Sequence, residues 1–104
     1  MAFENTKHRY ASFGIVSSIP GKLIDHFWFI IDHYLRGVLP LKHILRFRLK
    51  NRNGRMSISY AFSSRLTITV DTDIPFDPFY PHTVLVIDRK GEQTVALPDE
   101  LSIL

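Results

Sequence analysis

The side chains best suited to do chemistry in this sequence are a run of cations in the middle of the chain. Between residues 42 and 55 there are six Lys or Arg residues and no carboxylate. Guanidinium and ammonium groups bind carboxylates and phosphates through charge-assisted hydrogen bonds. The run therefore indicates a surface for an acidic protein, for a nucleic acid backbone, or for the chain's own acidic part. Its members are Lys42, Arg46, Arg48, Lys50, Arg52 and Arg55, and Arg65 lies at a later turn.

The formal net charge of +3 conceals an uneven distribution of charge along the chain. Residues 1–65 carry 11 basic and 3 acidic side chains, whereas residues 66–104 carry 2 and 7. Asp71, Asp73 and Asp77 lie together in a segment rich in proline and aromatic residues, 71–81. Opposite charges on two parts of one chain favour association with a complementary protein, including a second copy of the chain.

Signatures of catalysis are missing from the sequence. The chain has no cysteine, which excludes disulfides, thiolate zinc sites and cysteine nucleophiles and favours a reducing compartment. Its five glycines form no nucleophile elbow, phosphate-binding loop or dinucleotide fingerprint. We therefore predict that the protein is not an enzyme and uses no cofactor, with an enzyme subunit or small-ligand binder as the remote alternative.

Histidines and aspartates are the residues that could hold a metal ion. His26 and His33 lie seven positions apart, about 10.5 Å along a helix, so they cannot share one ion. The acidic segment is interrupted by Pro75 and Pro78, and it lacks the glycine and terminal glutamate of a calcium loop. No metal site is predicted.

The basic run is predicted to lie on a β-hairpin. Asn53-Gly54 favours a two-residue turn, which pairs residues whose numbers sum to 107. This register puts the apolar residues on one face and the cations on the other, and a slip of one residue would mix the two faces. A second turn at 63–65 adds a third strand. We therefore expect Arg46, Arg48 and Lys50 to form one basic sheet face, with Arg52 and Arg55 at its tip and Arg65 at the neighbouring turn.

One helix is predicted from Pro20 to Arg36, because its apolar residues recur at the i, i+3, i+4 spacing of an amphipathic helix. Ser17 and Ser18 are expected to cap its start, and Gly37 is expected to end it. On its polar side, Asp32 is expected to pair with Arg36 one turn later. Phe29 is the one aromatic residue on that side, which makes it a candidate for docking a partner.

Further strands are predicted at 9–13, 83–87 and 93–97, with the apolar strand 83–87 inside the sheet. The segment 71–81 is expected to be a non-strand loop because it contains three prolines. The fold class is therefore α+β: an antiparallel or mixed sheet of about five to six strands in the order β-α-β-β-β-β-β, with one helix on one face. The length indicates one small domain, 1–104. Phe76, Phe79 and Tyr80 are the candidate docking aromatics of the loop.

Short motifs also suggest a family. They are Arg9-Tyr10, Ile19-Pro20, Ile31-Asp32, Val86-Ile87-Asp88 and Leu97-Pro98 with Glu100. In these the chain resembles a family of Firmicute proteins of similar length, the staphylococcal type among them, that is classed as a domain of unknown function. The resemblance implies a fold and a bacterial cytoplasmic setting, and no activity. The chain departs from the family on the hairpin, where Ser57, Ser59 and Ala61 replace more strongly polar residues.

We therefore predict a protein-interaction or self-associating module that uses the basic sheet face and the acidic, aromatic loop. Nucleic acid binding through the basic hairpin is the alternative. It is weakened because the hairpin aromatics are predicted to point inward, where they cannot stack on bases. No membrane partner is expected, because the longest apolar run, Phe27 to Ile31, is far shorter than the roughly 18 residues of a span. The expected location is the cytoplasm.

Overall fold

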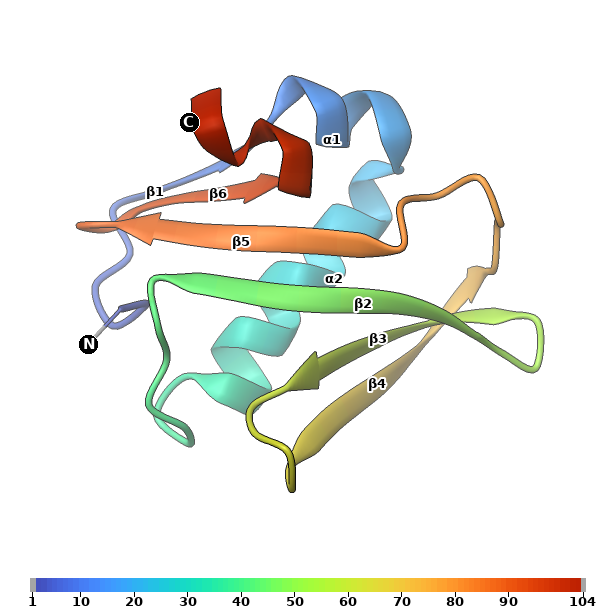
Figure 1. Ribbon diagram of the computed structural model, residues 1–104, viewed down its shortest axis with the longest axis horizontal. Helices are drawn as coiled ribbons and strands as arrows, with labels where there is room; N and C mark the ends of the chain where they lie inside the picture. The colour runs from blue at the N-terminus through green and yellow to red at the C-terminus, as the bar shows by residue number, and fades with distance from the viewer. Residues whose placement is uncertain (1, 104) are drawn as a thin grey trace.

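The computed structural model describes residues 2–103, and these form a six-stranded mixed sheet with a long helical segment across one face (Figure 1). Met1 and Leu104, which the predicted 1–104 domain includes, lie outside the described residues. The elements are, in chain order, β1 (His8–Ala11), α1 (Phe13–Ser18), α2 (Gly21–Ile30), the π-helix η1 (Ile31–Leu35), β2 (Ile44–Arg52), β3 (Arg55–Ala61), β4 (Thr67–Pro75), β5 (Thr83–Arg89), β6 (Glu92–Ala96) and the 3-10 helix η2 (Pro98–Ile103).

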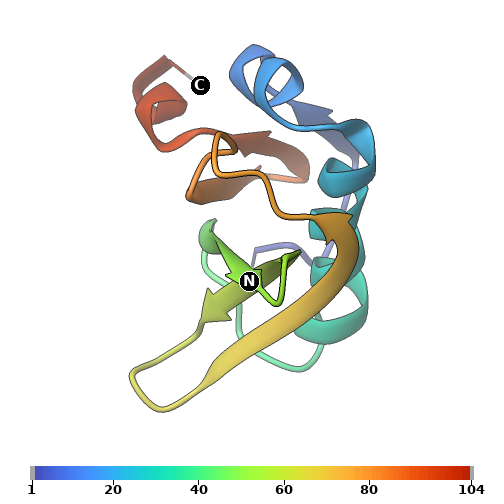
Figure 2. The ribbon, with the colours of Figure 1, turned by 90° about the vertical axis from the view of Figure 1, so that its right-hand side faces the viewer.

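The strands lie in the order β1-β6-β5-β2-β3-β4. β1 runs parallel to β6, and every other neighbouring pair is antiparallel. Residues Val84 to Ile87 of β5 are all buried, as the apolar sequence of this strand predicted. The predicted α+β class is confirmed. Figure 2 shows a strong twist of the sheet from β5 to β4. In this view β4 crosses in front of α2.

The predicted hairpin register is confirmed. Arg52 pairs with Arg55 and Phe47 pairs with Tyr60, so the residue numbers of each pair sum to 107. Asn53 and Gly54 both have positive φ angles, 56° and 83°, as this turn type requires. The turn is therefore a local determinant that fixes which side chains of β2 and β3 share a face.

The main core lies between the sheet and the helical segment. The Phe47 ring of β2 is at its centre, with ring centroids 5.4 Å from Phe27 of α2 and 5.5 Å from Tyr60 of β3. On the opposite face of the sheet, η2 packs Leu101 against a smaller apolar cluster formed by Leu85, Ile87 and Ala96. Both faces of the sheet are therefore covered at its β5–β6 side.

The helix was predicted in the right place, but its cap was wrong. The helical backbone runs from Gly21 to Leu35, with its last five residues as a π-helix. Ser17 and Ser18 do not cap it, because they belong to the separate short helix α1. The Ser12 side chain caps α1 by accepting a hydrogen bond of 3.2 Å from the backbone N–H of Ile15. Six residues are too few to show an apolar periodicity, which explains why the sequence did not reveal α1.

The prediction of a non-strand loop over 71–81 was wrong for its first half. β4 continues to Pro75, which stands at the last position of the strand, where a missing backbone donor does least harm. The pairing of β3 with β4 shifts between Arg55 and Ser57. Here the buried hydroxyl of Thr72 donates to the Met56 carbonyl at 2.7 Å and accepts from the Ile74 N–H at 3.1 Å. These bonds replace the regular backbone ladder at this point and keep the end of β4 attached to β3.

The Glu100→Gln variant is expected to destabilise the protein by about 1 kcal/mol at neutral pH, a typical loss for a helix-cap contact. The Glu100 carboxylate accepts hydrogen bonds from the Ser12 hydroxyl and from the N–H groups of Leu97 and Gly14, at 2.5, 2.9 and 3.1 Å. These contacts, the Ser12 bond above all, hold the pKa of Glu100 below its ordinary value. Denaturant unfolding of the variant and the natural chain measures the loss.

The same carboxylate sets the pH dependence of this loss. Because the pKa of Glu100 is lowered in the folded state, its ionised carboxylate stabilises the fold at pH values above the ordinary pKa of a glutamate. This contribution disappears as the pH falls through the lowered pKa. The difference in free energy of unfolding between the natural chain and Glu100→Gln should therefore shrink in acid. Asp99→Asn, an exposed change one residue away, is the control and should shift stability by less than about 0.5 kcal/mol. A difference that stays constant into acid would contradict the prediction.

None of the helices in the described part of the chain is long and apolar enough to cross a membrane.

Candidate binding surface on the basic sheet face

The alternation of β2 separates its side chains cleanly. Leu45, Phe47 and Leu49 are buried under the helical segment, and the residues between them are exposed on the opposite face of the sheet. The hairpin turn then carries two more exposed cations beyond the core. We call this surface the basic face; it consists of Arg46, Arg48, Lys50, Arg52 and Arg55.

The charges of the basic face are poorly compensated. Among the side chains that the structure describes, one carboxylate approaches it: Asp71 Oδ1 lies 3.3 Å from Arg52 Nη1. The other four cations make no ion pair with any described side chain, and neither does Arg65 at the β3–β4 turn. Exposed like charges that the fold does not neutralise create a positive potential, which attracts anionic partners and raises their rate of association.

The hydroxyl groups next to the cations are already engaged. Ser57, which is buried, donates from its hydroxyl to Asp71 Oδ1 at 2.8 Å. The hydroxyls of Ser59 and Thr69 lie 2.8 Å apart and bond to each other. These groups bridge β3 to β4. A ligand on the basic face would therefore be recognised by the cations, with little help from these hydroxyls.

Apolar surface borders the basic face at the start of β2. A hollow of about 280 Å³ lies there between the loop before β2 and the end of β3. Ile44 and Phe62 line it and are 44% and 37% exposed, and Lys42 and Arg46 stand beside them. The surface thus combines guanidinium groups with exposed apolar side chains, a composition found at protein–protein interfaces.

The acidic segment does not face the solvent as a free anionic surface. Asp71 contacts Arg52 and Ser57. Asp73 Oδ2 lies 3.2 Å from Lys22 Nζ of α2, and this bond lowers the pKa of Asp73. Asp77 Oδ1 accepts a hydrogen bond of 2.9 Å from the Phe79 N–H. The charge complementarity predicted from the sequence is therefore used in part within one chain.

The candidate docking aromatics are not brought together. Phe29 and Phe79 are exposed, by 48% and 94%, whereas Phe76 and Tyr80 are partly buried against the core. Phe29 lies on α2, on the other side of the sheet from the basic face, and its ring centroid is 4.3 Å from that of His33. The sequence therefore identified two exposed aromatics, but no single aromatic surface.

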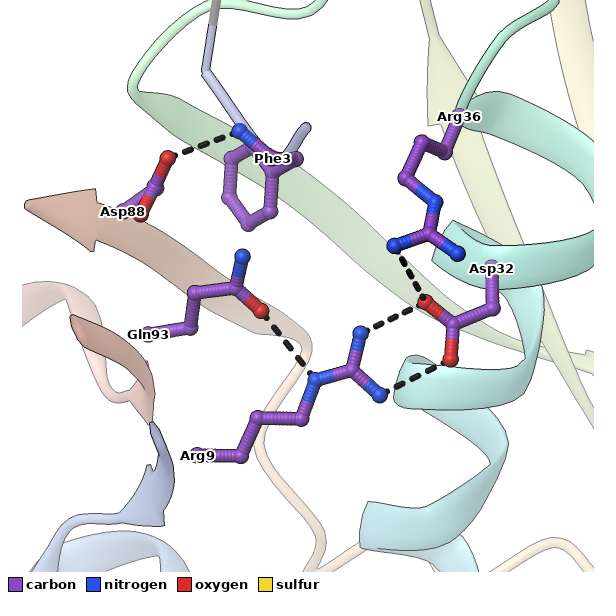
Figure 3. A network of polar contacts seen from close by, with 6 residues as sticks. All are labelled: Phe3, Arg9, Asp32, Arg36, Asp88 and Gln93. Carbon is purple, nitrogen blue, oxygen red and sulfur yellow. Dashed lines mark hydrogen bonds and ion pairs between the residues drawn. The ribbon is translucent and has the colours of Figure 1, made fainter. Parts of the chain in front are cut away.

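A polar network under the helix was missed by sequence reasoning (Figure 3). Arg9 of β1 donates two hydrogen bonds to the Asp32 carboxylate, at 2.8 and 2.5 Å, and a third of 3.1 Å from its Nε to Gln93 Oε1. Its guanidinium also lies 4.7 Å from the ring centre of Trp28. Arg36, the predicted partner of Asp32, is 4.0 Å away and therefore contributes less. No local spacing could reveal Arg9, because it is 23 positions from Asp32.

A separate set of polar contacts holds the start of the described chain. Asp88 of β5 accepts hydrogen bonds from the N–H groups of Phe3 and Gly91, at 2.7 and 2.9 Å. Gln93 is fully buried, and its Nε2 has no partner among the described residues. Asp88 thus ties the start of the described chain to β5, while Arg9 ties β1 to β6 and to the π-helix. No cluster of three or more His, Asp or Glu side chains with metal-ligand geometry occurs among the described residues.

Comparison with known proteins gives two matches. The model of a family described as a staphylococcal protein of unknown function (DUF960) matches residues 8–100. A crystal structure of a protein of unknown function from Enterococcus faecalis is similar with a TM-score of 0.85 and 36% sequence identity. That match covers 95% of this chain and 92% of the other. None of the curated proteins compared with the chain matches it.

Proposed function

Since the chain belongs to the DUF960 family of staphylococcal proteins of unknown function, we propose its role from its surface: a non-enzymatic module that binds an acidic protein through the basic face. The observation that carries this proposal is the row of exposed cations on β2 and its turn, of which only Arg52 has a carboxylate partner among the described side chains. An acidic partner would supply the missing counter-charges.

A protein partner is favoured over nucleic acid by what surrounds the cations. Ile44 and Phe62 add exposed apolar area next to Arg46, and apolar side chains with arginine are typical of protein interfaces. The neighbouring serine and threonine hydroxyls are bonded to one another or to Asp71, which reduces their use as phosphate ligands. Of the hairpin aromatics expected to point inward, Phe47 and Tyr60 are buried in the core and cannot stack on bases. That expectation was wrong for Phe62, which is 37% exposed beside Arg46, so a single aromatic ring, and no row of them, is open to a base.

A different protein is favoured over a second copy of this chain. Self-association of the predicted kind would require the acidic segment of one copy to neutralise the basic face of another. Two of its aspartates already contact Arg52 and Lys22 within their own chain. Releasing them would expose the cations that they now neutralise, which offsets the gain of the new contacts.

The proposal is tested with a polyglutamate peptide as the probe and with the charge-reversal variant Arg46→Glu/Arg48→Glu. The natural chain should bind the peptide at low salt and lose affinity as salt rises. The variant should bind at least about tenfold more weakly, because two of the attracting charges become repulsive. Isothermal titration calorimetry or fluorescence anisotropy measures both affinities.

Arg89→Glu/Lys90→Glu is the matched control, because it changes the net charge equally at the exposed β5–β6 turn, outside the basic face. It should retain most of the affinity of the natural chain. An equal loss in both variants would show attraction by net charge alone and would contradict a specific surface. Tighter binding of duplex DNA or RNA than of the peptide, lost in the Arg46/Arg48 variant, would assign the surface to nucleic acid instead.

A further inference from the structure

A second, larger hollow lies where the end of β5 meets the start of β2, on the face of the sheet that η2 covers in part. Its volume is about 430 Å³, within the range of about 300 to 1,000 Å³ that is usual for small-molecule sites. We propose that this larger hollow binds an amphiphilic anion, a molecule with a negatively charged head group and an unbranched aliphatic chain. The proposal does not depend on the function proposed for the basic face.

The floor of the larger hollow is aliphatic. Ile44 of β2 and Ile87 of β5 are partners in the antiparallel ladder, so their side chains lie next to each other on one face of the sheet. Leu101 of η2 lines the same hollow and packs against the apolar cluster that contains Ile87. Ile44 is 44% exposed, so apolar surface remains open to a ligand. No Phe, Tyr or Trp is among the described residues that line the hollow, which favours an aliphatic chain over a ligand that stacks.

The rim of the larger hollow is basic. Arg89 and Lys90 line it at the β5–β6 turn, and both are exposed. Neither makes an ion pair with a side chain that the structure describes. His43 stands on the same rim, with its Nδ1 3.3 Å from the Asp88 carbonyl oxygen. Uncompensated cations beside apolar surface attract the head group of an amphiphilic anion and bind it through charge-assisted hydrogen bonds.

The acidic residues next to Arg89, in the chain and in the ladder, bond elsewhere. Asp88 is the one acidic residue among the described residues that line the larger hollow. Its carboxylate points away toward the main core, where it accepts hydrogen bonds of 2.7 and 2.9 Å from two backbone N–H groups (Figure 3). Glu92, the ladder partner of Arg89, lies 3.0 Å from His8 Nδ1 and also bonds to Tyr10. The two cations of the rim are therefore left for the anion of a ligand.

The head group is tested with decanoate below its critical micelle concentration and with the two double variants used for polyglutamate. Arg89→Glu/Lys90→Glu reverses the charge of the rim, so it should bind decanoate at least about tenfold more weakly. Arg46→Glu/Arg48→Glu is the matched control, because it changes the net charge equally and neither residue lines the larger hollow. Its affinity should stay within about threefold of that of the natural chain. Isothermal titration calorimetry measures all three chains.

The aliphatic chain is tested by its length and by methyl NMR on the natural chain, so this test does not depend on the folding of a variant. Affinity should rise at least about twofold for each methylene added from hexanoate to decanoate, because each one leaves water on binding. Bound decanoate should shift the methyl signals of Ile44, Ile87 and Leu101. Decyltrimethylammonium, with the same chain and a positive head group, should bind at least about tenfold more weakly.

Decyl phosphate distinguishes the two sources of the negative charge. Tighter binding of decyl phosphate than of decanoate, lost in Arg89→Glu/Lys90→Glu, would support the site and assign a phosphate head group. The opposite order would assign a carboxylate. Either order requires the cations of the rim, because both head groups bind through them.

Three results would overturn the proposal. Decanoate and decyl phosphate show no saturable binding, or they bind both double variants as tightly as the natural chain. Decyltrimethylammonium binds as tightly as decanoate, which would leave apolar contact without recognition of charge. Polyglutamate displaces decanoate, which would make the larger hollow part of the basic-face interface. The polyglutamate affinities of the same two variants should show the reverse order, so the two proposals fail separately.

Discussion

Phe47→Ala is expected to lower the free energy of unfolding by about 3 to 5 kcal/mol, the largest effect among the changes considered for this protein. The Phe47 side chain is fully buried. Its ring packs against Phe27 from the helix and Tyr60 from the next strand, so its removal leaves a cavity where sheet and helix meet. Single domains have a free energy of unfolding of about 5 to 15 kcal/mol. The variant should therefore lose a large share of its stability and unfold at a much lower denaturant concentration.

Chemical denaturation followed by circular dichroism measures this change. Phe79→Ala is the control, because it removes the same atoms from a side chain that is 94% exposed, and it should change stability by less than about 0.5 kcal/mol. Phe47→Leu should fall between the two, since leucine refills part of the cavity. A loss below about 1 kcal/mol for Phe47→Ala would contradict the central position of this ring in the core.

Arg9→Ala is expected to cost about 2 to 3 kcal/mol, the second largest effect. The guanidinium makes a bidentate contact with Asp32, bonds to the buried Gln93 side chain and packs on Trp28. Its removal leaves the partly buried Asp32 carboxylate without its main partner, and the fully buried Gln93 with no hydrogen bond to either side-chain atom. Unpaired buried polar groups are costly because neither protein nor water satisfies them.

A double-mutant cycle with Arg9→Ala and Asp32→Ala separates the pair from its surroundings. Arg36→Ala is the control, since its contact with Asp32 is 4.0 Å long and more exposed, and it should cost about 0.5 kcal/mol or less. The hydrogen bonds from Arg9 hold the pKa of Asp32 below its ordinary value. An NMR titration of Arg9→Ala should show this pKa moving back up.

The sign of the pH effect follows from that lowered pKa. The ionised Asp32 carboxylate stabilises the folded state above its ordinary pKa, and this contribution is lost as pH falls through the lowered value. The stability difference between the natural chain and Arg9→Ala should therefore be full at neutral pH and smaller in acid. An additive cycle, or a pKa of Asp32 that does not move, would show that the two side chains are not coupled.

Elements with a strong local signal were predicted well. The Asn53-Gly54 turn fixed the register of β2 and β3, because both residues accept the positive φ angles that this turn needs. The apolar spacing of 20–36 identified the helix, and the uniformly apolar 84–87 identified an interior strand. The exposed positions of Arg46, Arg48 and Lys50 followed from the same register.

Elements that depend on distant residues were not visible in the sequence. The six-residue α1 relies on Glu100, which is more than eighty positions away. The final residues of β4 are held by the Thr72 hydroxyl on Met56, in spite of the proline that suggested a loop. For Asp32, the neighbour Arg36 was expected, but Arg9 is the main partner because the fold brings β1 beneath the π-helix.

The order of residues along the chain decides which side chains share a face, because periodicity and turn chemistry are properties of neighbouring residues. It thereby placed the cations of β2 opposite the core. Which charges remain without a partner depends on the complete fold, which pairs Asp71 and Asp73 with cations of the same chain, leaves most of the basic face uncompensated and places β4 at an open edge. Ion pairs and strand neighbours join residues that are far apart in the sequence. Their distances in space are set only when the whole domain packs.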